Sequence, residues 1–192
     1  RRVLFRSELY AGNDRTVDLS LISGADNVNV VSNANVAVGD RLTLNNAASN
    51  QVLNFVGNGN DENQTFNGVS HNLSSDGNSD SATFNINNDG NDASNGTATL
   101  TGITADNVEN ITINGSDFKA IDLNENAAGA NTSFDNAENL TINTSAALDF
   151  TVNTGDGFDA GSNLAEIDAS NSNGDITFGT LTGVTGALEF NG

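Results

Sequence analysis

A nine-residue segment occurs twice in this chain with almost the same sequence. Residues 106–114 read Asp-Asn-Val-Glu-Asn-Ile-Thr-Ile-Asn, and residues 135–143 read Asp-Asn-Ala-Glu-Asn-Leu-Thr-Ile-Asn. Each copy ends in alternating apolar and polar residues, which is the period of a strand with one buried face. A unit built around one short strand cannot bury that face alone, whereas stacked copies can. The repeat therefore predicts a solenoid rather than an ordinary globular domain.

Short alternating segments also recur along the rest of the chain, between loops rich in Asn, Asp, Gly and Ser. We expect strands at residues 28–31, 36–38, 42–44, 52–56, 83–86, 97–103, 111–113, 121–123, 140–142, 148–152, 176–178 and 188–190. Many short strands without helical periodicity indicate a sandwich, a barrel or a β-helix. Recurrence of one strand sequence favours the β-helix, because equivalent side chains then stack from coil to coil. The fold class is therefore predicted to be all-β, a parallel β-helix (β-solenoid) of short strands with variable loops.

The twin segments predict specific neighbours inside this β-helix. Ile111 and Ile113 should lie in the core, stacked near Leu140 and Ile142. Weaker echoes pair residues 25–33 with 105–114, 84–93 with 150–160, and 118–122 with 164–168. Their unequal spacing is expected of coils that keep their strands and vary their loops.

The high asparagine content predicts side-chain hydrogen bonds along such a stack. An Asn at equivalent turn positions can hydrogen-bond to its copy in the next coil, about 4.8 Å along the axis. Asn114 and Asn143 end the twin strands and are the candidates for this ladder.

The N-terminal residues 1–7, Arg-Arg-Val-Leu-Phe-Arg-Ser, resemble the translation of a sequencing-library adapter. We expect them to be an artefact. Residues 8–192 are then expected to form a single β-solenoid fragment of a longer protein, less regular over residues 8–90. In that part the only basic residues are Arg15, Arg41 and Lys119.

The charge balance excludes two classes of partner. The net charge is -19, from 25 acidic and six basic residues, so nucleic acid and anionic membrane surfaces should repel the chain. No apolar run approaches the ~20 residues of a membrane span, and membrane insertion is not expected. Such an acidic chain should recruit cations, and calcium (Ca2+) is the predicted cofactor.

Signals for catalysis are sparse. His71 is the only histidine, in a polar stretch, and it is expected to be an exposed loop residue. No nucleophile, base and orienting group stand at a spacing typical of a hydrolytic triad. The chain is therefore predicted not to be an enzyme.

Calcium binds carboxylates, Asn side chains and backbone carbonyls, six to eight oxygens in all. Two segments, 89–92 and 156–159, each place two carboxylates three residues apart across a glycine, and segments near residues 26 and 61 are weaker relatives. The candidate metal ligands are Asp89, Asp92, Asp156, Asp159, Asp26 and Asp61.

Residues 97–114, 134–153 and 164–178 resemble the repeat regions of bacterial surface-layer proteins and RTX-type adhesins. The resemblance lies in Ala-Asp-Asn-Val-Glu-Asn-Ile-Thr-Ile and Leu-Ala-Glu-Ile-Asp-Ala-Ser. It implies a calcium-dependent β-helix that is exported and then assembled into a lattice or anchored at the bacterial cell surface. Complete RTX nonapeptides are absent, which leaves the number and position of metal sites open.

Three functions are consistent with these observations. The first is a structural segment of a surface-layer or related exoprotein, an acidic, calcium-stabilised rod that contacts other copies of itself or cell-surface components. The second is a segment of a large adhesin that binds surfaces or glycans, and the third is a polysaccharide-active β-helix enzyme. Sugar sites usually present Trp or Tyr, and the chain has no Trp and one Tyr, so the structural role is favoured.

Overall fold

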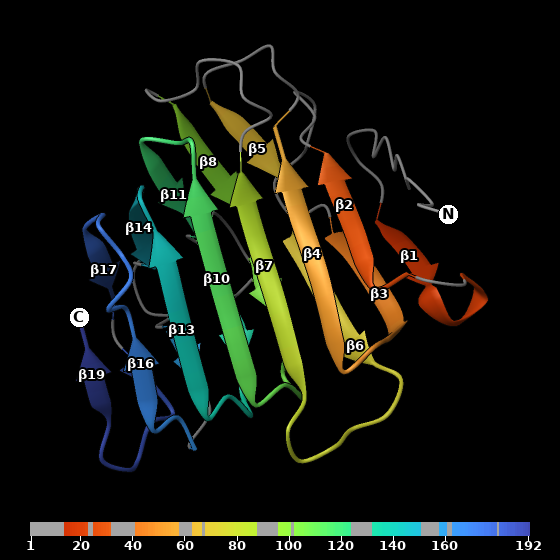
Figure 1. The fold of residues 1–192 in the computed structure, drawn as a ribbon. Coiled ribbons are helices and arrows are strands. Elements are labelled where there is room, and N and C mark those ends of the chain that lie inside the picture. Colours follow the sequence, from red (N-terminus) through yellow and green to blue (C-terminus); the bar gives the residue numbers. More distant parts are fainter. Residues whose placement is uncertain are drawn as a thin grey trace.

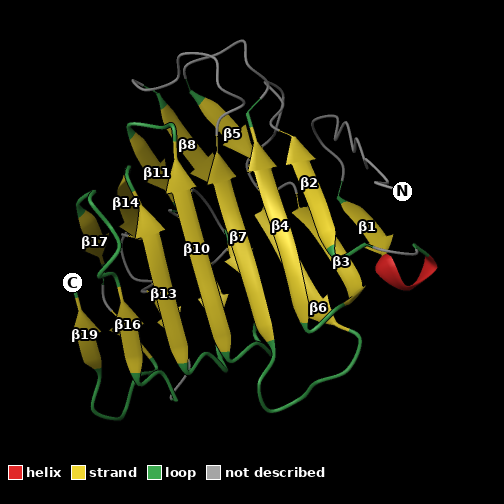
Figure 2. Ribbon diagram, in the orientation of Figure 1, coloured by secondary structure: helices red, strands yellow, loops and turns green. Residues whose placement is uncertain are grey.

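The computed structural model describes most of the chain (Figure 1). The described residues are 14–22, 25–31, 41–57, 63–66, 68–87, 96–100, 102–123, 132–150, 158–160, 163–179 and 181–192. Nearly all of their regular structure is strand, apart from the 3₁₀ turn η1 (Leu19–Leu21) (Figure 2).

Three parallel sheets make up the molecule, named here sheets A, B and C. Sheet A contains β1 (Arg15–Asp18), β3 (Arg41–Ala47), β6 (Gly68–Leu73), β9 (Ile103–Thr104), β12 (Ser133–Phe134), β15 (Phe158–Ala160) and β18 (Leu181–Thr182). Sheet B contains β2 (Asn27–Val31), β4 (Asn50–Val56), β7 (Ser81–Asn87), β10 (Asn110–Ser116), β13 (Asn139–Thr144), β16 (Glu166–Asp168) and β19 (Glu189–Asn191). Sheet C contains β5 (Gln64–Phe66), β8 (Thr97–Leu100), β11 (Ala120–Asp122), β14 (Ala147–Phe150) and β17 (Ile176–Phe178).

The chain visits the three sheets in the same cyclic order. β3 in sheet A is followed by β4 in sheet B and β5 in sheet C, and the next coil starts again in sheet A with β6. Within each sheet, neighbouring strands come from successive coils and run parallel, so that the first strand, β1, and the last, β19, lie at opposite ends of the stack (Figure 1). The predicted parallel β-helix is therefore confirmed.

Alternation along the strands fills one continuous apolar core. In β4, β7 and β10 every second residue is buried and the residues between are half-buried or exposed. Phenylalanines join the sheets across the interior, as in the edge-to-face pair Phe55–Phe66, with ring centroids 5.6 Å apart, and the stacked pair Phe84–Phe134 at 6.2 Å. Such pairs add about 0.5–1.5 kcal/mol each beyond the burial of their area.

The twin segments occupy equivalent places in sheet B, as predicted. Ile111 pairs with Leu140 and Ile113 with Ile142 in one parallel register, and all four side chains are fully buried. Burial of each contributes roughly 1.5–3 kcal/mol. These contacts show why the repeat is nearly verbatim, since each inward residue must fit directly on its copy.

Several sequence-based expectations differ from the structure in detail. The segment 97–103 forms two strands rather than one, β8 in sheet C and β9 in sheet A. Gly102, with φ 116°, stands between them in a backbone conformation that favours glycine. The prediction missed strands β1, β5, β6, β12, β15, β16 and β18, because each has only one large apolar residue or, in β6, two that are four positions apart. The expected strand at 36–38 lies outside the described residues.

The weaker sequence echoes do not mark structural equivalents. Phe84 lies in sheet B and Phe150 in sheet C, while Asp122 lies in sheet C and Asp168 in sheet B. The alignment of 25–33 with 105–114 is also wrong by several residues, because it is Asn29 that shares a register position with Asn114.

Candidate functional site

The outer face of sheet B carries an asparagine ladder that crosses five successive coils. The Nδ2 of Asn54 donates to Oδ1 of Asn29 at 3.0 Å, and Nδ2 of Asn85 donates to Oδ1 of Asn54 at 2.8 Å. The ladder continues from Asn114 to Asn85 at 2.7 Å and from Asn143 to Asn114 at 2.9 Å. The predicted pair Asn114–Asn143 is thus confirmed, as two of five members.

Sequence reasoning missed Asn29, Asn54 and Asn85 as members of this ladder. The available signal was an Asn between two inward-facing residues, as in Leu53-Asn54-Phe55 and Phe84-Asn85-Ile86. This signal recurs at intervals of 25, 31, 29 and 29 residues. The ladder lies on strands rather than at turns, because the register places Asn on the outer face of each strand.

A second column on the same face runs beside the ladder. Thr83, Thr112 and Thr141 are in register on β7, β10 and β13, two residues before the ladder asparagines of those strands. At the start of the strands, Nδ2 of Asn139 also donates to Oδ1 of Asn110 at 2.9 Å. The face is thus a regular polar array, with the spacing between strands, about 4.8 Å, as its repeat.

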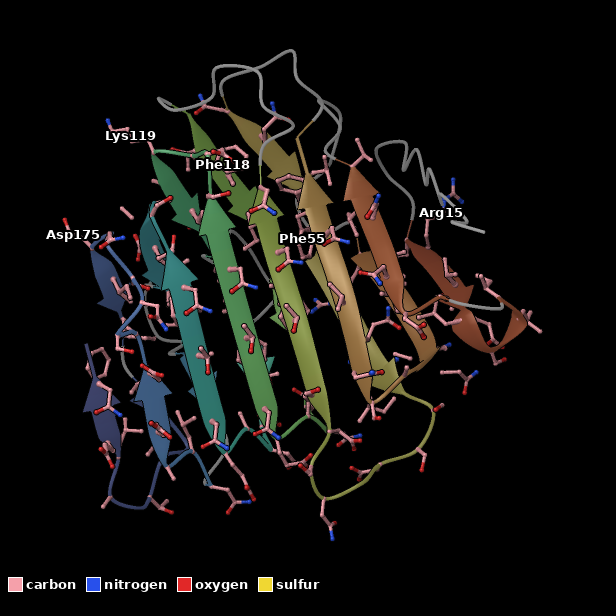
Figure 3. All side chains as sticks on the ribbon, in the orientation of Figure 1. Arg15, Phe55, Phe118, Lys119 and Asp175 are labelled. Atoms are coloured by element: carbon pink, nitrogen blue, oxygen red, sulfur yellow. The ribbon has the colours of Figure 1, made fainter. Side chains whose placement is uncertain are left out.

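This array has no charge, although the chain is strongly acidic. Among the described residues, β2, β4, β7, β10 and β13 contain no Asp, Glu, Lys or Arg. The basic residues Arg15 and Lys119 lie away from the front of the sheet in Figure 3. We call the outer side of these five strands the neutral face.

Carboxylates border the neutral face on two sides. Glu166, Asp168 and Glu189 belong to β16 and β19, the last two strands of sheet B. Asp80, Glu109 and Glu138 each directly precede one of the strands β7, β10 and β13. Acidic residues therefore mark the limits of the neutral face, both along sheet B and at the start of its strands.

Two of the bordering carboxylates are buried and hydrogen-bonded to backbone. Asp80 Oδ2 accepts a hydrogen bond from Gly77 N–H at 2.6 Å, and Glu109 Oε2 accepts one from Asp80 N–H at 2.7 Å. Asp80 is 5% exposed and Glu109 is 8% exposed. These two carboxylates stabilise the turns that precede the strands, and they do not face solvent where they could bind a metal ion together.

The outer face of sheet A has different chemistry, with charges held among hydroxyls. Arg41 on β3 crosses two strands, its Nε donating to Ser70 Oγ at 2.6 Å and its Nη2 donating to Thr104 Oγ1 at 2.5 Å. Burial lowers the pKa of Arg41, while the negative charges of Asp106 and Asp14 oppose that shift. The guanidinium thus ties three coils together.

The two aspartates of the twin segments meet next to this arginine. Ser133 Oγ lies 2.6 Å from Asp106 Oδ1 and 2.9 Å from Asp135 Oδ1. One hydroxyl has a single proton, so it donates to one carboxylate at a time. The pKa of Asp106 is raised, first by burial and further by the charge of Asp135, whereas the bond from Ser133 acts in the opposite direction.

The expectation for His71 is wrong, because this residue is not in an exposed loop. It lies on β6 with its side chain in the core, level with Leu44 of β3, and is only 3% exposed. Neither ring nitrogen has a hydrogen-bond partner among the described residues. Burial lowers its pKa from 6.5 to about 4, so the ring is neutral at pH 7.

Most predicted calcium ligands cannot be placed. Asp61, Asp89, Asp92 and Asp156 lie outside the described residues, and Asp159 is described only as part of β15. Asp26 is exposed and directly precedes β2. Across the part of the chain that the structure describes, no three His, Asp or Glu side chains are grouped closely enough to hold a metal ion.

No helix among the described residues has the length and apolar character needed to cross a membrane. Models of known protein families, curated proteins and solved structures give no match to this chain.

Proposed function

We propose that this chain is a structural segment of an exported bacterial surface-layer protein or a related exoprotein. Its role is mechanical. It acts as a stiff, acidic rod at the cell surface, stabilised by calcium and in contact with other copies or with cell-surface components.

The continuous ladder on sheet B is the observation that supports this role most strongly. Side-chain hydrogen bonds of 2.7–3.0 Å connect every coil from Asn29 to Asn143, and they add to the backbone pairing of the same strands. Each coil is therefore held to the next both inside and outside. Such a stack resists bending and separation of its coils, which is the property that a rod requires.

Two residues with potential for acid–base or electrophilic chemistry, His71 and Arg41, are buried or hydrogen-bonded within the protein. His71, the only histidine, lies in the core where it has no access to a substrate. Arg41, half-buried, is bound to Ser70 and Thr104. A screen against polysaccharides, esters and peptides should therefore show no turnover. Activity that is lost in His71→Ala would contradict this assignment.

Calcium is part of the proposal because of the charge. With a net charge of -19, the folded chain holds carboxylates close together, and a divalent cation bound to the native state relieves their repulsion. Binding stabilises that state by RT ln(1 + [L]/Kd), about 2.7 kcal/mol at a hundredfold excess over Kd. The ligands proposed are those named from the sequence, first Asp89 and Asp92, then Asp156 and Asp159.

Thermal unfolding of the full chain tests this part directly. The melting temperature should rise in millimolar calcium and fall with a chelator, and sodium chloride at equal ionic strength should not substitute. The double variant Asp89→Asn/Asp92→Asn should lose most of the calcium response. Asp175→Asn, at an exposed aspartate, is the matched control and should keep it. Equal effects of sodium and calcium would reduce the response to charge screening.

A further inference from the structure

The neutral face is exceptional on a chain of this charge. Unit charges 4 Å apart interact by about 1 kcal/mol in water and by more as water is excluded, so acidic surfaces resist close approach to one another. On β2, β4, β7, β10 and β13 this resistance is absent, since none of their residues is charged. A partner can contact this area without desolvating a carboxylate.

The groups on this face are suited to a partner that carries the same groups. An amide has both donors and acceptors, and each Asn in the ladder uses only part of that capacity for its neighbours. Thr112 and its equivalents add hydroxyls, which also donate and accept. A surface of this kind is self-complementary, as a two-fold symmetric contact requires.

Periodicity favours a second copy over other uncharged partners. Both copies repeat at the spacing between strands, about 4.8 Å, so side chains of one face can fit between those of the other over several coils. The strands of the neutral face lie side by side in one continuous layer, and none of the described segments covers them in the view of Figure 1. Five strands of up to seven residues give about 500 Å² on each copy, at the lower end for specific interfaces.

We infer that the neutral face is a contact between two copies of this chain, packed face to face across sheet B. The inference rests on the proposed structural role and names the surface that this role uses. Because the contact area is small, we expect a single contact to be weak. Where many copies are held together in one assembly, the contacts add up to a stronger association.

Sedimentation equilibrium of the full chain tests the contact, in calcium-containing buffer from about 10 μM to about 1 mM, the range for weak interfaces. The wild type should show reversible dimers. Thr112→Glu places a charge within the face, on β10 beside its central strand β7, and should weaken association at least about tenfold. Thr99→Glu, at a half-buried outward position on sheet C, is the matched control and should associate like the wild type.

Charge reversal separates loss of contact from loss of folding. An equimolar mixture of Thr112→Glu and Thr112→Lys should restore dimers, which misfolded variants cannot do. Dimers of Thr112→Glu as stable as those of the wild type would overturn this contact and leave the structural role standing, with another face in use. A wild type that stays monomeric throughout would overturn the contact between copies and leave only contact with cell-surface components for the proposed structural role. A monomer that binds an uncharged polysaccharide through Thr112 would also overturn the inference, with the polysaccharide as the occupant.

Discussion

Sheets A and B are built from the same coils, yet they differ in regularity. In sheet B, β4, β7 and β10 have seven residues each and pair without a break in register. In sheet A, β9 and β12 have only two residues each, and the pairing of β3 with β6 shifts at Asn46, which has φ 57°. Both sheets face the same continuous core, so their difference in strand length and register does not come from separate cores. It comes from how regularly the residues of each strand recur from coil to coil.

The outer residues of the two sheets account for this difference. In sheet B a slip of one residue would turn the ladder asparagines into the core and the isoleucines out to solvent, so the register is strongly specified. In sheet A the outer residues are varied, and Arg41 reaches across strands to Ser70 and Thr104. Sheet A therefore accommodates a bulge, a buried histidine and charged groups, which the five strands of the neutral face lack.

The largest effect is expected in the core of sheet B. Ile113→Asp should lower the free energy of unfolding by about 4 kcal/mol or more, because the carboxylate would be buried without a partner. Urea unfolding measures this loss. Thr112→Asn, one residue away on the outer face, is the control and should stay within about 0.5 kcal/mol. Similar losses for both would show that the alternation of inward and outward residues is wrong.

The next effect concerns the buried histidine of sheet A. The pKa of His71 is about 4 in the folded chain and 6.5 when exposed, so the unfolded chain takes up the proton first as pH falls. Stability should therefore be complete above pH 6.5 and decrease by about 3 kcal/mol towards pH 4. Measuring the free energy of unfolding at a series of pH values gives the dependence of stability on pH. The variant His71→Leu should lose the part of that dependence that comes from the histidine. An unchanged slope in His71→Leu would assign the acid sensitivity to carboxylates.

A smaller effect compares the ladder of sheet B with an isolated pair in sheet A. Asn114→Ala removes one bond donated to Asn85 and one accepted from Asn143, and should cost about 1–2 kcal/mol. Asn72→Ala removes one exposed bond, 2.9 Å long, to Asn45 and should cost less than about 0.5 kcal/mol. Equal costs in urea unfolding would mean that continuity of the ladder adds nothing.

The sequence was sufficient to predict the fold class where one strand is repeated almost verbatim. Asn110 to Asn143 carry the alternation, the burial of Ile111 and Ile113, and one step of the ladder, and all of these are confirmed. The reason is physical, because stacked coils place like residues in like surroundings. The weaker echoes misled for the same reason, since short runs such as Ile-Asp fit the alternation of any sheet.

Sheet A and the candidate sites were less predictable. His71 lies between polar residues, and nothing in the local pattern shows that its strand turns this side chain inward. The contact of Arg41 with Thr104 joins residues 63 positions apart, through a register that depends on loop lengths. The calcium ligands were predicted from loop composition, and they remain a prediction.

Distances between outward positions of sheet B test the central claim, a parallel and in-register stack, most directly. The chain has no cysteine, so spin labels can be attached at Asn29→Cys with Asn143→Cys, and at Asn27→Cys with Asn191→Cys. These pairs are separated by four and six strand spacings, which predicts about 19 Å and about 29 Å in pulsed electron paramagnetic resonance. Two narrow distributions that differ by about 10 Å are expected. Equal distances, or a longer distance for the first pair, would contradict the stack.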